Sequence, residues 1–147
     1  MLNLLEIQMN DERGFSLVEM LIVVAIIGIL AGIATPMLRK AKYAADAGSA
    51  VATVRTLVTA ERLYQLKFDA YGTLTDLVPE ATLDTTVQSG TKSGYAFAIT
   101  VSSDKKSFNC TADPLVDDPV APHYFVDDTG VIRSNQGSPA DATSTPI

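Results

Sequence analysis

Glu19 is the one charged residue in an apolar stretch that runs from Phe15 to Leu38. A lone carboxylate placed in hydrocarbon costs on the order of several kcal/mol, so an acid in a membrane helix points to a functional pairing. Directly upstream lies the junction Arg13-Gly14-Phe15-Ser16. Glu19 is therefore the first candidate functional residue, and it requires a partner that the apolar stretch itself does not supply.

The other reactive side chains give weaker signals. His123 and Cys110 are the sole histidine and the sole cysteine. A lone imidazole with no nucleophile elbow, phosphate loop or zinc spacing beside it does not make a catalytic site. Cys110 cannot form a disulfide within the chain, and its strand-like neighbours predict a small buried thiol. We expect no enzyme activity and no cofactor, with an enzyme tethered by a membrane helix as an alternative.

A group of aspartates raises the question of a metal site. Carboxylate oxygens of this kind suit calcium, but Asp in turns more often bonds to the backbone of its own turn. We therefore predict turn residues and no metal, with calcium as the open alternative. The residues concerned are Asp113, Asp117, Asp118, Asp127 and Asp128.

Composition and charge narrow the class of protein. The 147 residues are 47% hydrophobic and 19% charged, which fits one modest globular domain plus the apolar stretch. A net charge of −6 argues against nucleic acid as a partner, because phosphate binding needs clustered Lys and Arg. The one basic cluster, Arg39, Lys40 and Lys42, follows the apolar stretch and is expected to anchor it at a membrane interface.

The apolar stretch is a candidate membrane helix, because crossing a bilayer takes about 20 residues. Gly28 and Gly32 form a small-xxx-small pair, which allows helices to approach closely, and Pro36 is expected to kink the helix near its end. No loop signal follows, so the helix is predicted to continue to Phe68 as a rod of about 54 residues and roughly 80 Å. Apolar residues then recur at helical spacing: Tyr43, Ala47, Ala50, Val51, Val54, Leu57, Val58, Tyr64 and Phe68.

Three residues complicate the second half of this helix. Glu61 projects onto the apolar stripe, where we expect a partly exposed carboxylate or one paired with Arg62 or Lys67. Leu63 and Leu66 lie on the opposite face, which predicts a second buried surface against the same domain or another copy of the chain.

Beyond Phe68 the periodicity changes from helix to strand. Residues 69–72 should break the helix, and residues 73–79 should form a short capped turn of helix. Strands at 94–101 and 106–111 flank a turn at 102–105, and strands at 123–126 and 131–133 flank the turn Asp127 to Gly130. The polar segment 134–147 is predicted to be a loose tail. The fold class is α+β, with a long N-terminal helix on a small antiparallel sheet.

The segment Arg13-Gly14-Phe15-Ser16-Leu17-Val18-Glu19-Met20-Leu21-Ile22-Val23-Val24-Ala25-Ile26-Ile27-Gly28-Ile29-Leu30-Ala31 resembles the processing site and N-terminal helix of type IV pilins and of type II secretion pseudopilins. The resemblance implies that a membrane-embedded prepilin peptidase cuts after Gly14 and methylates the new amino group of Phe15. It also implies that Glu19 pairs with the N-terminal amine of a neighbouring subunit, and Pro36 matches the helix-bending proline of that family.

The resemblance further implies an organisation and a life cycle. Residues 1–14 would be a cleaved leader, 15–38 the transmembrane and filament-core helix, 39–133 the pilin-like domain, and 134–147 the tail. The precursor would sit in the inner membrane with its C-terminal domain outside the cytoplasm, in contact with lipid, the peptidase and the assembly machinery. It would then polymerise with itself or with other pilins into a type IV pilus at the cell surface, or, as the alternative, into a periplasmic pseudopilus of a secretion system.

Some features depart from that family or fit a rival. The leader is net acidic through Glu6, Asp11 and Glu12, whereas leaders in that family are usually short and basic, and a true start at Met9 is one explanation. The basic cluster after the apolar stretch opposes the expected orientation. Cys110 cannot close the C-terminal disulfide loop that many pilins have. The rival is a secretory signal peptide cut after Gly32-Ile33-Ala34, which would leave Thr35 as the new N-terminus.

Overall fold

The computed structural model describes residues 14–79, 83, 85–116 and 118–147. Residues 1–13 of the predicted leader, including Met9 and Arg13, and one residue of the possible calcium loop, Asp117, lie outside these residues. The described residues divide into two compact units, one that ends at Arg39 and one that begins at Lys40.

The long helix predicted from the sequence is confirmed. It is α1, which runs from Leu17 to Phe68 over 52 residues and contains Pro36. It ends where Asp69 adopts a positive φ of 52° and donates its backbone N–H to the carbonyl of Gln65 at 2.8 Å. The ammonium of Lys106 donates to the Asp69 carbonyl at 2.9 Å, so the end of α1 is tied to the turn before β3.

A short helix follows the predicted break. α2 covers Leu74–Leu77, and Thr73 precedes it as the capping residue. The Asp76 carboxylate accepts the backbone N–H of Thr73 at 2.9 Å and its hydroxyl at 2.7 Å. Asp76 is only partly exposed, and these hydrogen bonds lower its pKa. A second short helix, α3 at Thr85–Gln88, was not predicted.

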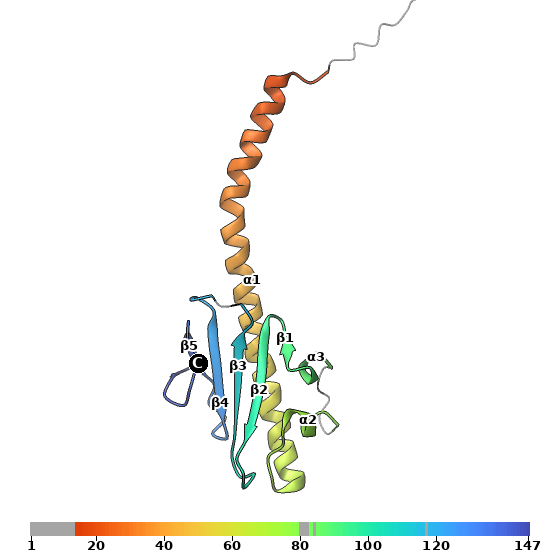
Figure 1. Cartoon of the computed structure of the whole chain (residues 1–147), viewed down its shortest axis with the longest axis vertical. Helices are drawn as coiled ribbons and strands as arrows, with labels where there is room; N and C mark the ends of the chain where they lie inside the picture. Colours follow the sequence, from red (N-terminus) through yellow and green to blue (C-terminus); the bar gives the residue numbers. More distant parts are fainter. Residues whose placement is uncertain (1–13, 80–82, 84, 117) are drawn as a thin grey trace, which may run out of the picture. The chain divides into compact units, whose positions relative to one another are not determined.

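Within the described residues, six strands form one antiparallel sheet in the order of the sequence, β1-β2-β3-β4-β5-β6, of which Figure 1 labels β1 to β5. Both predicted hairpins are present, although the last strand of the second begins at Arg133 and not at Val131. β2 pairs with β3 in a register that places Ile99 opposite Cys110, and β4 pairs with β5 across a turn in which Gly130 has a φ of +77°. The strands are β1 Thr91–Lys92, β2 Tyr95–Val101, β3 Phe108–Pro114, β4 Pro122–Asp127, β5 Arg133–Gln136 and β6 Thr145–Pro146.

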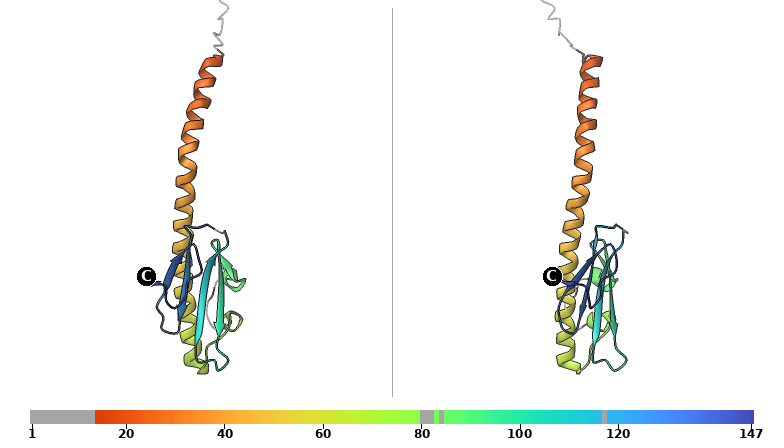
Figure 2. Two further views of the ribbon diagram at one scale, coloured as in Figure 1. Left: turned by 60° about the vertical axis from the view of Figure 1, so that its left-hand side comes forward. Right: turned by 90° about the vertical axis from the view of Figure 1, so that its left-hand side faces the viewer.

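The core of the second unit lies between the sheet and the part of α1 that follows residue 40 (Figure 2). Ala50, Val54 and Leu57 recur at helical spacing on the buried face of α1. β3 contributes alternate residues, including Cys110, which is fully buried as predicted. Burial raises the pKa of its thiol to about 12, so the sulfur remains an unreactive thiol at neutral pH.

The prediction of a loose C-terminal tail is wrong. β6 pairs with β5, and the backbone N–H of Ile147 donates to the carbonyl of Ile132 at 3.0 Å. Ala140 is buried, and the Asp141 carboxylate holds a turn by accepting the N–H and hydroxyl of Thr143. These strands are short and polar and pair through the backbone, so their composition carries no hydrophobic alternation from which pairing could be read.

The expected environment of Glu61 is also wrong. Its side chain is fully buried, and its Oε2 accepts the backbone N–H of Gly72 at 3.0 Å. Its Oε1 has no hydrogen-bond partner among the described residues. Helical spacing correctly placed Glu61 on the buried stripe of α1. It could not predict that the segment after α1 would cover this side chain. Leu63 and Leu66 remain 56% and 83% exposed, so the described residues do not bury the second surface that they were expected to form.

Candidate functional site

The first unit presents an apolar helix that nothing in the described chain covers. Side chains from Phe15 to Leu38 are exposed, Phe15 at 83% and Leu38 at 74%. Within the described residues, α1 is the one helix long and apolar enough to cross a membrane, and its most apolar window is not buried at all. A contiguous apolar surface of this size marks a membrane or protein interaction site.

Glu19 lies in the first turn of α1, where it forms a capping box with Ser16. Glu19 Oε2 accepts the backbone N–H of Ser16 at 2.8 Å, and Ser16 Oγ accepts the backbone N–H of Val18 at 3.2 Å. The signature S-x-x-E is present as Ser16-Leu17-Val18-Glu19, so the sequence held this signal although it was not recognised. A negative charge at this position also interacts favourably with the positive N-terminal end of the helix dipole. Glu19 therefore has a local partner within its own chain.

The predicted cleavage junction lies just outside the helix. Gly14, Phe15 and Ser16 precede α1, and all three are exposed. A Cβ added at Gly14 would meet no heavy atom within 4 Å. The chain itself therefore has room for a larger residue at Gly14, and any requirement for glycine there must come from another molecule.

The predicted kink residue Pro36 lies inside α1, so this position lacks a backbone donor for the helical ladder. The hydroxyl of the preceding residue, Thr35, donates to the carbonyl of Ala31 at 2.8 Å. Gly28 and Gly32 face open space, because a Cβ at either would meet nothing within 4 Å. Another helix could therefore approach this part of α1 closely.

His123 and the aspartates serve local structure in the second unit. His123 Nδ1 lies 2.6 Å from Asp113 Oδ1, as a pair between β4 and β3. Asp118 accepts the N–H of Val120, and Asp127 accepts the N–H of Thr129, which are the turn roles expected of them. In the part of the chain that the structure describes, no three His, Cys, Asp or Glu side chains are grouped so as to hold a metal ion.

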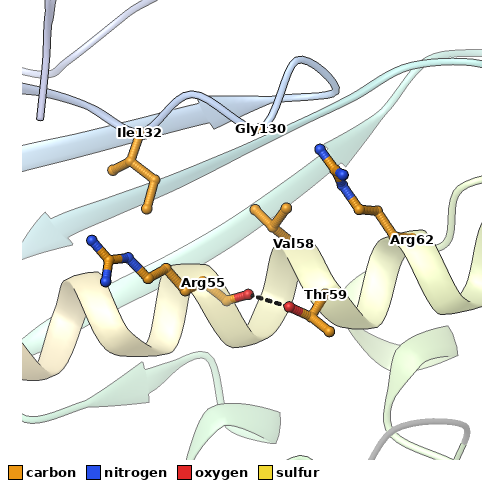
Figure 3. A pocket seen from close by; sticks show the side chains of 6 residues that line it. All are labelled: Arg55, Val58, Thr59, Arg62, Gly130 and Ile132. Atoms are coloured by element: carbon orange, nitrogen blue, oxygen red, sulfur yellow. Dashed lines mark hydrogen bonds between the residues drawn. The ribbon is translucent and has the colours of Figure 1, made fainter.

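A shallow pocket of about 270 Å³ lies between α1 and the β4–β5 turn (Figure 3). Arg55 and Arg62 stand at its two ends, with Val58 between them pointing toward the turn. The sequence did not predict this pocket, because it forms only when Gly130 and Ile132 are brought against the helix. The lining residues are Arg55, Val58, Thr59, Arg62, Gly130 and Ile132.

Comparison with known proteins adds family information for the N-terminal half. Residues 9–35 match the family model of the prokaryotic N-terminal methylation motif. The chain is 36% identical over 90 residues to type II secretion system core protein G of Escherichia coli, which covers 58% of this chain and 62% of that protein. It is 42% identical over 60 residues to the type IV major pilin protein PilA of Myxococcus xanthus, covering 41% of this chain and 27% of the pilin.

A third relative is the type IV wide pilus major component PilA4 of Thermus thermophilus, at 36% identity over 63 residues, covering 43% of this chain and 48% of that protein. The chain thus spans between about a quarter and three fifths of the length of these relatives. No solved structure matches the chain. The resemblance that residues 13–31 indicated is confirmed by the motif and by these relatives.

Proposed function

We propose that this chain, which resembles type IV pilins and type II secretion pseudopilins, is the precursor of a structural subunit that polymerises into a filament. One observation carries the proposal: a methylation motif stands directly before an apolar helix whose side chains no described residue covers. That surface needs lipid before assembly and the helices of other subunits afterwards. The chain acts through its surfaces and not as an enzyme.

Processing takes place at the exposed junction between Gly14 and Phe15. A prepilin peptidase in the inner membrane removes residues 1–14 and methylates the amino group of Phe15. The junction precedes α1 and is free of packing contacts at Gly14, which supports its access to an enzyme. A glycine fits a peptidase subsite that admits only a small side chain.

Assembly then joins Glu19 of one subunit to the amine of Phe15 on a neighbour. The cap and this pairing are compatible, because an ionised carboxylate offers about four acceptor positions and Ser16 uses one of them through Oε2. An ammonium in hydrocarbon and a carboxylate in hydrocarbon each carry a large desolvation cost, which pairing offsets. Charge neutralisation therefore accompanies the transfer of the apolar helix from lipid into the filament.

Residues 15–38 hold the precursor in the inner membrane, and the domain from residue 39 onward lies outside the cytoplasm. Pro36 bends the helix or allows its preceding turn to open when subunits pack, since the ladder already lacks one hydrogen bond there. The partners are other copies of the chain or related pilins, the peptidase, the membrane-bound assembly machinery and lipid. The principal product is a type IV pilus at the cell surface.

A pseudopilus of a type II secretion system is the second candidate. The match to secretion protein G extends over 90 residues of alignment, beyond the 60 and 63 residues matched by the two pilins. It therefore includes part of the domain as well as the N-terminal helix. In that case the filament stays in the periplasm, and shearing of cells releases none of this chain.

The test is the mass of the mature N-terminus, measured on protein recovered from the cell envelope. The proposal expects a peptide that begins with methylated Phe15. A mature protein that begins at Thr35 would instead identify a secretory signal peptide, and an unprocessed chain would also contradict the proposal. The fate of sheared filaments separates the two candidates, since a pilus releases this chain into the supernatant as its main component.

A further inference from the structure

The pocket in Figure 3 holds two unpaired positive charges. Arg55 and Arg62 are both exposed, and within the described residues neither guanidinium has a hydrogen-bond or ion-pair partner. Arg62 rests above the β4–β5 turn: a Cβ built at Gly130 would lie 2.5 Å from its Nη2. Gly130 thus suits this turn for two reasons: its φ is positive, and a side chain there would occupy the space of the Arg62 guanidinium.

The two arginines belong to one exposed stripe on α1. Arg55, Thr59, Arg62 and Leu66 follow one another at intervals of four, three and four residues, which places them on one helical face. Seven residues separate the Cα atoms of the two arginines by roughly 10.5 Å along the helix axis. Leu66, at 83% exposure, adds an uncovered apolar contact at the end of the stripe. Such a combination of arginine and apolar side chains is typical of protein interfaces.

The same unit also carries unpaired acidic side chains, whose charge is complementary to that of Arg55 and Arg62. Among the described residues from 40 to 147, the carboxylates of Asp46 and Asp128 have neither a hydrogen-bond nor an ion-pair partner, whereas the other aspartates bond to neighbours. Asp128 belongs to the turn beside the pocket, yet forms no ion pair with Arg62 of its own chain. Two unpaired arginines, the exposed Asp128 and the half-buried Asp46 thus belong to one acidic chain.

We propose that the Arg55–Arg62 pocket binds the carboxylate of Asp46 or Asp128 of a second copy of this chain, as a contact between domains in the filament. This inference rests on the proposed assembly function and assigns part of its interface. The geometry disfavours a lipid headgroup as occupant: Arg55 lies 15 residues beyond Lys40, or about 22 Å along the helix from the basic cluster expected at the membrane surface.

Charge reversal and charge exchange in the full chain test the contact. The double variant Arg55→Glu with Arg62→Glu should reduce assembled polymer roughly fivefold, the size expected when two exposed ion pairs are lost. Adding Asp46→Arg or Asp128→Arg should restore assembly. Lys105→Glu, an exposed charge reversal away from the pocket, and the charge-keeping change of both arginines to lysine are the matched controls. Polymer is measured as sheared filament or as a cross-linked ladder in the envelope.

Each outcome has a distinct meaning. Restoration by either aspartate exchange supports the contact and identifies its partner residue. Assembly of the double glutamate variant at the wild-type level overturns the inference while leaving the proposed function intact. Loss of assembly that neither exchange restores also overturns it. Failure of the wild-type chain to form any polymer counts against the proposed function itself. If the glutamate variant misfolds by near-ultraviolet circular dichroism, the double change to glutamine tests the loss of the positive charges alone, and wild-type assembly of that variant overturns the inference.

Discussion

Glu61 Oε2 accepts the backbone N–H of Gly72 at 3.0 Å, so a fully buried carboxyl on α1 holds the segment that leads from the helix to α2. Burial raises its pKa to about 7, and the nearby Asp76 charge adds to the rise, while the hydrogen bond from Gly72 opposes it. Cys110 faces the same region from β3, and the Glu61 charge contributes to the raised pKa of its thiol. The second unit therefore contains a group that titrates near neutral pH.

This titration predicts a stability that falls as the pH rises. A folded pKa of about 7 against 4.5 unfolded means that the native state binds the extra proton between these values, so the stabilisation is full below about pH 4.5 and lost through pH 7. The loss is on the order of 3 kcal/mol by pH 8. Glu61→Gln keeps an acceptor for Gly72 and should remove this slope between pH 5 and 8, leaving the variant more stable than wild type at pH 8.

Thermal unfolding of the full chain in detergent, followed by the near-ultraviolet circular dichroism of its tyrosines, measures that slope. Tyr71, Tyr95 and Tyr124 are buried in the core and report its packing. Equal pH dependence in wild type and Glu61→Gln would show that Glu61 does not titrate in this range. Asp76→Asn removes the neighbouring charge and should move the wild-type transition to lower pH.

The capping box gives a second prediction. Ser16→Ala removes the acceptor for the Val18 N–H and should destabilise the first turn of α1 by about 1 kcal/mol. Hydrogen exchange of the Val18 amide in the full precursor should then be several-fold faster, whereas Ser16→Asn should retain protection because Asn also caps helices. Unchanged exchange in Ser16→Ala would mean that the hydroxyl does not cap the helix.

A bulky residue at Gly14 gives a third prediction. Gly14→Leu should leave an uncleaved precursor in the membrane, because the peptidase subsite excludes the larger side chain. The structure makes this a clean test, since a Cβ at Gly14 meets nothing within 4 Å and the chain's own fold is undisturbed. The intact mass of the envelope protein distinguishes precursor from mature chain, and Gly14→Ala is the smaller control. Normal processing of Gly14→Leu would contradict the proposed cleavage site.

Much of this architecture could be read from the sequence because its signals are local. The long helix follows from an uninterrupted apolar and then amphipathic pattern, and the two hairpins follow from strand residues around turns that end in Lys105 and Gly130. The buried position of Glu61 depends on Gly72, which is brought over it by the turn after α1. The Arg55–Arg62 pocket likewise needs the β4–β5 turn, and β6 pairs through its backbone. Such non-local arrangements leave no periodicity in the sequence.

The candidate site also shows this difference between local signals, which the sequence carries, and contacts with other molecules, which it does not. Roles for Glu19, Gly14 and Phe15 were predicted from a dense local motif, and the family model covers the same segment. The cap between Ser16 and Glu19 was also present as a four-residue signature, but a lone charge in an apolar stretch indicates a distant partner more strongly than a nearby one. A local cap requires only an acceptor oxygen at Glu19, whereas pairing with an amine of another subunit requires its negative charge. Mutations can separate these two requirements.

The measurement that separates them is the yield of assembled polymer from Glu19→Gln and Glu19→Ala beside wild type, with processing confirmed by mass in each. Glu19→Gln retains an oxygen to accept the Ser16 N–H but removes the negative charge, so the cap can persist without the pairing. Pairing of Glu19 with the Phe15 amine of a neighbouring subunit predicts that both variants are cleaved after Gly14 and methylated at Phe15, yet yield little or no polymer. It also predicts that Ser16→Ala assembles. Polymer from Glu19→Gln at the wild-type level would contradict it.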